Sequence, residues 1–86
     1  MADFRAVLSD AALAGADPVV VDLGHVSFID STGLGSLIEL HHRMRRDNRQ
    51  LAVVAPAGTA AAVLIGLAGL RGRLPVFETR RAALQA

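Results

Sequence analysis

The 86-residue sequence contains no cysteine, lysine, tryptophan or tyrosine. Without cysteine the chain has no disulfide and no thiolate for a metal ion, so aliphatic packing must hold it together. Without lysine it has neither a P-loop nor a Schiff-base nucleophile. Its formal net charge is +1, and three phenylalanines stand alone among the larger aromatic residues, since tryptophan and tyrosine are absent. A dedicated nucleic-acid-binding protein is therefore excluded, because such proteins need a basic face or stacking platforms.

Length and composition predict one folded domain over residues 1–86, with 52% hydrophobic and 20% charged residues. The first sixteen residues carry Asp3, Arg5 and Asp10 in place of a basic start and an apolar core, so we expect no signal peptide and a cytoplasmic location. Residues 51–70 are uncharged and long enough to cross a bilayer. Pro56 and Gly58 interrupt that run, so a strand followed by an alanine-rich helix is predicted there, and no membrane association.

Along the chain, stretches with the apolar spacing of a helix alternate with stretches that are typical of a strand. The β-branched run at 19–23 has little polar alternation, which is typical of a strand in a parallel sheet covered by helices. Strict alternation of the two element types predicts an α/β fold with an open sheet. The expected helices are 4–15, 34–46, a third that residues 56–59 open and that runs to about 68, and 80–85. The expected strands are 19–23, 50–54 and 74–77.

The stretch 30–35, Asp-Ser-Thr-Gly-Leu-Gly, follows a strand pattern and opens a helix pattern. Free backbone N–H groups at a helix start favour an anion, so a negative group could be held here. A simpler interpretation makes Ser31 the N-cap, with Gly33 and Gly35 letting the helix approach the sheet closely. The sequence alone leaves both open. A dinucleotide-binding fingerprint is excluded, because Ile38 stands where the third glycine is required.

Asp22 and Asp30 could form a carboxylate pair for a metal ion or for acid–base chemistry, since both lie near strand ends. The simpler interpretation is a loop-bonding group and a helix cap. The histidines do not have metal-ligand spacing, because His41 and His42 point about 100° apart on a helix. His41 borders the apolar stripe and is expected to be partly buried. No catalytic residue, metal site or cofactor is therefore predicted.

Residues 19–35, VVVDLGHVSFIDSTGLG, resemble the STAS domains of bacterial anti-sigma factor antagonists. A buried strand ending in Asp-Leu and a loop Val-x-Phe-Ile-Asp-Ser-Thr-Gly-Leu-Gly carry this resemblance, which continues through 50–56, Gly69-Leu70 and 74–77. Family members usually begin with two further strands, whereas this chain starts at the first helix. The resemblance thus implies a STAS-like open sheet that is shortened at its N-terminus, with an edge through which a homodimer could form.

The resemblance implies a non-enzymatic regulator of transcription that works by partner switching. The unphosphorylated antagonist binds an anti-sigma factor serine kinase and releases the sigma factor, phosphorylation switches it off, and a serine phosphatase resets it. The family's phosphoacceptor corresponds to Ser31. The matching partner-binding loop consists of Asp30, Ser31, Thr32, Gly33, Leu34 and Gly35.

An alternative from another class is a non-switching STAS subunit, a scaffold within a sensor or lipid-transport assembly. In that case Ser31 is only a cap, and the domain contributes a constant binding surface. A reversible, ATP-sensitive interaction with a kinase distinguishes the switch from the scaffold.

Overall fold

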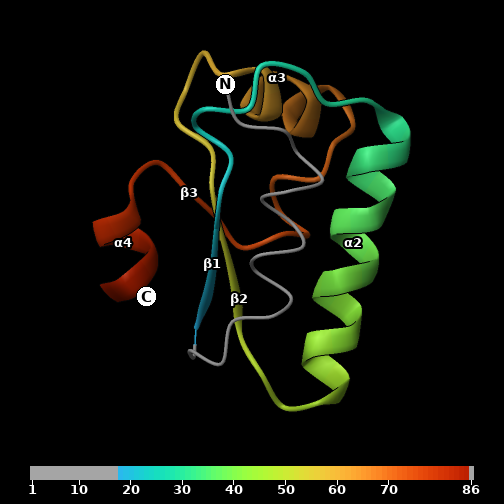
Figure 1. Cartoon of the computed structure of the whole chain (residues 1–86), viewed down its shortest axis with the longest axis vertical. Helices are drawn as coiled ribbons and strands as arrows, with labels where there is room; N and C mark the ends of the chain where they lie inside the picture. The colour runs from blue at the N-terminus through green and yellow to red at the C-terminus, as the bar shows by residue number, and fades with distance from the viewer. Residues whose placement is uncertain (1–17, 86) are drawn as a thin grey trace.

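The computed structural model describes residues 18–85 (Figure 1). Strands and helices alternate along this range, as the sequence predicts, and the expected helix at 4–15 lies outside the described residues. The elements are β1 (Val19–Asp22), α2 (Ser31–Arg46), β2 (Leu51–Val54), α3 (Ala60–Leu67), β3 (Val76–Phe77) and α4 (Arg80–Gln85).

The described strands form one parallel sheet in the order β1-β2-β3, which confirms the predicted α/β open sheet. Strand β1 pairs with β2 along its whole length, from Val19 opposite Leu51 onward. Strand β3 is shorter than the expected 74–77. Of the two expected residues that lie outside β3, residue 75 is a proline, which has no N–H to donate. The N–H of the other, Leu74, is bonded to the Leu70 carbonyl at 3.0 Å, in the preceding turn.

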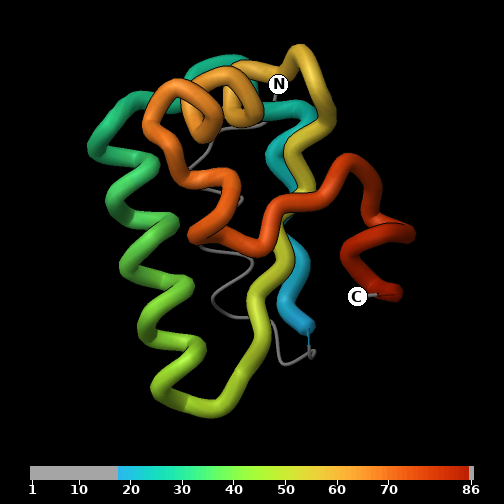
Figure 2. The backbone as a smooth tube through the Cα atoms, turned by 180° about the vertical axis from the view of Figure 1, so that it is seen from behind, coloured from blue at the N-terminus to red at the C-terminus, as the bar shows by residue number. Residues whose placement is uncertain are grey.

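Helices cover both faces of the sheet unequally (Figures 1 and 2). The crossovers from β1 to β2 and from β2 to β3 run in the same direction across the sheet, so α2 and α3 lie on the same face. There their apolar side chains form the main core with the strands. The shorter α4 covers the other face, and Ala83 packs there with Ala52 and Val54. Strand β2 is buried throughout, whereas Val20 and Asp22 of β1 are only half-buried, so β1 is less enclosed than its sequence suggests.

Helix α2 joins the candidate loop to the core. Its buried residues, Leu34, Leu37, Leu40 and Met44, confirm the predicted apolar face. On the exposed face Glu39 and Arg43, four residues apart, form an ion pair at 3.5 Å. Among residues 18–85 no helix is long and apolar enough to cross a membrane, since the uncharged run 51–70 is divided between β2 and α3.

Candidate functional site: the loop that opens helix α2

Asp30 is the N-cap of helix α2. Its backbone is extended, at φ −116° and ψ −177°, and its Oδ1 accepts a hydrogen bond of 2.8 Å from the N–H of Gly33. Its carbonyl accepts the N–H of Leu34 at 2.9 Å, which starts the helical ladder. The interpretation of Ser31 as the cap is therefore wrong, because the carboxylate one residue earlier already satisfies the N–H that a cap serves.

Ser31 is the first residue of α2 and is exposed. Its hydroxyl makes no hydrogen bond to another residue in the described part of the chain. The hydroxyl of Ser36, five residues further along the helix, differs, because its Oγ donates to the Thr32 carbonyl at 3.2 Å. Ser31 thus presents a hydroxyl that the local fold does not use.

The six residues of the predicted partner-binding loop do not share one environment. Asp30, Ser31, Thr32 and Gly35 are exposed and Gly33 is half-buried, while Leu34 is buried in the main core and fixes the loop to it. A Cβ added at Gly35 would meet nothing within 4 Å, so this glycine does not serve a close approach of helix and sheet. The accessible part of the site is therefore Asp30, Ser31 and Thr32, with Gly35 one turn further on.

The division of roles between Asp30 and Ser31 gives a stability prediction. We expect Asp30→Ala to lower the free energy of unfolding by about 0.5–2 kcal/mol, since it removes the cap. Ser31→Ala is expected to change it by less than about 0.5 kcal/mol, because the exposed hydroxyl contributes no bond to the described fold. Urea unfolding of both variants measures this difference, and a larger loss for Ser31→Ala would contradict the assignment of the cap.

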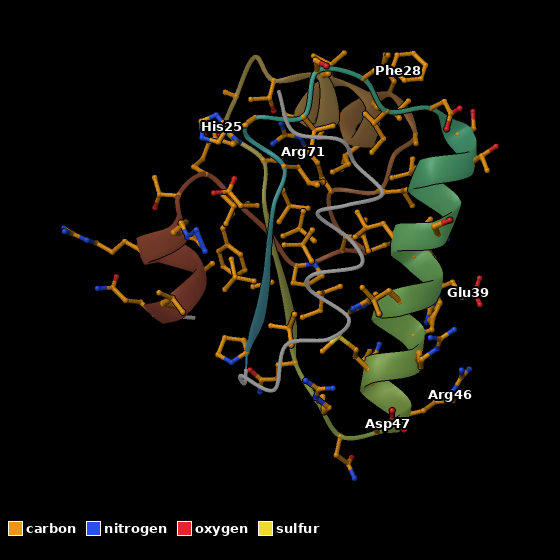
Figure 3. All side chains as sticks on the ribbon, viewed as in Figure 1. His25, Phe28, Glu39, Arg46, Asp47 and Arg71 are labelled. Atoms are coloured by element: carbon orange, nitrogen blue, oxygen red, sulfur yellow. The ribbon has the colours of Figure 1, made fainter. Side chains whose placement is uncertain are left out.

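Exposed apolar side chains lie at the same end of the domain as the loop. Phe28, just before Asp30, is 72% exposed, and Leu67 and Val63 on α3 are 81% and 53% exposed. Figure 3 shows Phe28 projecting from the loop at the end of the domain where α3 lies. On α3 the apolar surface comes from Val63 and Leu67, whereas Ala61 and Ala62 are buried.

The two carboxylates considered for metal chemistry have separate local roles. Oδ1 of Asp22 accepts the Gly24 N–H at 2.9 Å, and its Oδ2 lies 3.7 Å from an Arg80 guanidinium nitrogen. Asp30 caps α2, so the simpler interpretation of both residues is confirmed. Within the described range no group of three or more potential metal-ligating side chains comes together.

His41 is partly buried on α2, as expected from its place beside the apolar stripe. Its Nδ1 is buried and has no hydrogen-bond partner among the described residues. Desolvation lowers the pKa of His41 below the usual 6.5, and the nearby His42 and Arg45 lower it further. The neutral imidazole is therefore the favoured form in the folded domain.

The lowered pKa of His41 predicts a pH dependence of stability. The unfolded chain takes up a proton here near pH 6.5, while the folded domain does so only at lower pH. The free energy of unfolding should therefore decrease as the pH falls below about 6.5, until the folded-state pKa is passed. Urea unfolding at several pH values should show this decrease in the wild type and in His25→Gln, which keeps His41. An undiminished decrease in His41→Gln would contradict the origin assigned to it.

The fold and the loop together define a small α/β domain with a parallel open sheet, whose accessible site is a capped helix start. A comparison with protein-family models matches the STAS domain to residues 1–83. The chain therefore belongs to the STAS domain family. Comparisons with curated proteins and with solved structures gave no match.

Proposed function

We propose that this STAS domain is an anti-sigma factor antagonist that acts by partner switching. Unphosphorylated, it binds an anti-sigma factor that is also a serine kinase, and so releases a sigma factor. Phosphorylation of Ser31 ends the interaction, and a serine phosphatase restores it. The observation that carries this proposal is the exposed Ser31 hydroxyl, next to a cap supplied by Asp30.

A phosphate at Ser31 fits the folded domain. It adds a charge of about −1.5 to −2 and three acceptor oxygens. The positive end of the α2 dipole and the N–H groups of its first turn favour an anion at this position. The Asp30 carboxylate adjoins it, so phosphorylation concentrates negative charge on one exposed point while the core beneath, anchored by Leu34, stays intact.

The surroundings of Ser31 suit a protein partner. Asp30 and Thr32 are exposed beside it, and Phe28 and Leu67 expose large apolar side chains at the same end of the domain. Exposed aromatic side chains are typical anchors of protein interfaces. A partner that covers this surface would bring its own groups against the serine, where a new charge must be desolvated or repelled.

The scaffold alternative assigned Ser31 to capping alone. Because Asp30 performs that task, this alternative no longer accounts for the serine, and the switch is the function that the geometry supports better. In a scaffold the hydroxyl would be dispensable for both folding and binding.

Mapping the phosphate tests the proposal. With the cognate kinase and ATP, mass spectrometry should place the phosphate on Ser31. Ser31→Ala should abolish the labelling, and the matched control Ser36→Ala, one turn along the same helix, should keep it. Phosphate mainly on Thr32 or Ser36 would refute the assignment of the acceptor.

A further inference from the structure

A cavity lies at the other end of α2 from Ser31. It is a groove of about 230 Å³ that is open to solvent. Apolar atoms dominate its lining, which includes Leu51 and Ala52 of β2, Phe77 of β3 and Ala83 of α4. His41 and Arg45 of α2 also line it. At 1.5 Å per helical residue, Arg45 lies about 21 Å along the helix from Ser31, so the two sites are separate.

The shortness of β3 creates the groove. Strand β3 pairs with β2 only at Val53 and Val54, so among the described residues no strand adjoins the β3-facing edge of β2 at Leu51 and Ala52. Helix α4 covers the sheet at Ala83 but is only six residues long. An apolar recess therefore remains where a longer third strand would lie.

Helix α2 contributes one cation and one imidazole to the groove. His41 and Arg45 are four residues apart on α2 and so lie on one face of the helix. In the described part of the chain no carboxylate pairs with Arg45, and the nearby Glu39 is paired with Arg43 instead. The half-buried imidazole of His41 lines the groove beside it. An unpaired guanidinium and an imidazole thus adjoin an apolar recess.

We propose that this groove binds a small amphipathic anion, a medium-chain carboxylate. The carboxylate would accept hydrogen bonds from the Arg45 guanidinium, whose planar fork matches it, and from a ring N–H of His41. The hydrocarbon chain would lie against Leu51, Phe77 and Ala83. The groove is smaller than the roughly 300–1,000 Å³ of pockets for drug-sized ligands, which limits the ligand to a single short chain.

Titration of the ¹⁵N-labelled domain with octanoate tests the proposal by NMR. Saturable amide shifts are expected at Leu51, Ala52 and Phe77. Arg45→Gln should weaken octanoate binding about tenfold, the effect of losing one charge-assisted hydrogen bond. Arg46→Gln is the matched control, since Arg46 is an exposed neighbour that does not line the groove. It should bind octanoate as the wild type does.

Two further ligands separate the contributions of charge and chain. Octanol has the same chain without the charge, and acetate has the charge without the chain, so both should bind at least tenfold more weakly than octanoate. Octanol binding as tightly as octanoate, equal losses in Arg45→Gln and Arg46→Gln, or no saturable shift in the groove would each overturn the proposal. None of these readouts involves the kinase, so the outcome is independent of the switch at Ser31.

Discussion

Replacing Ser31 with aspartate is expected to weaken binding to the anti-sigma factor kinase by about 5- to 150-fold relative to Ser31→Ala. This range corresponds to about 1–3 kcal/mol for a new carboxylate that must be desolvated or repelled at the interface beside Asp30. Ser31→Ala should bind as the unphosphorylated protein does and be permanently active. Calorimetric titration of both variants against the kinase measures the difference.

The controls for this pair follow from the capping geometry. Both variants should fold, because Asp30 still caps α2 and an acid in the first helical turn suits the dipole. Ser36→Asp adds the same charge on the same helix away from the proposed acceptor, and it should weaken binding less than Ser31→Asp. If Ser31→Ala and Ser31→Asp bind with equal affinity, and circular dichroism shows that both are folded, the result would favour the scaffold function over the switch.

Replacing Leu37 with alanine is expected to lower the free energy of unfolding by about 2–5 kcal/mol, the usual range for a buried leucine. Leu37 is fully buried, at 0% exposure, and belongs to the core cluster that α2 shares with the sheet. A domain of this length has a total stability of roughly 4–13 kcal/mol, so the loss is a large share of it. Urea denaturation followed by circular dichroism measures the loss.

Leu67→Ala is the matched control for this core substitution. It makes the same change on a helix, but the Leu67 side chain is 81% exposed. Its effect on stability should stay within about 0.5 kcal/mol. A loss for Leu67→Ala as large as that for Leu37→Ala would show that stability does not follow the burial described here.

The fold was predictable where local pattern and tertiary packing agree. The apolar spacing of α2 indicates a helix and the β-branched run of β1 indicates a strand, and both elements are present in the structure. The length of β3 was not predictable in this way. Leu74 is apolar, so its residue type fits the start of a strand. In the structure it is buried in the core as part of the turn after α3, where its N–H is bonded to the Leu70 carbonyl, and the residue type alone does not indicate this turn.

The candidate site was predictable in position but not in detail. Asp30, Ser31 and Thr32 are all residues that cap helices well, and their order does not reveal which one has the extended backbone that a cap requires. The groove at Arg45 left no signal in the sequence. Its lining comes from two helices and two strands that meet only in the folded domain, and its depth depends on the missing length of β3.

The parallel sheet also has a consequence for how the chain folds. Each pair of neighbouring strands is separated in the sequence by a helix. Val19 pairs with Leu51 across α2, and Val53 pairs with Val76 across α3. Contacts between residues so distant in sequence form slowly, because loop-closure entropy is lost before the contacts compensate for it. On the ribosome, β2 emerges while one of its edges still has no partner. Substitutions in β2, such as Val53→Ala, should therefore slow folding more than substitutions in the terminal helix α4.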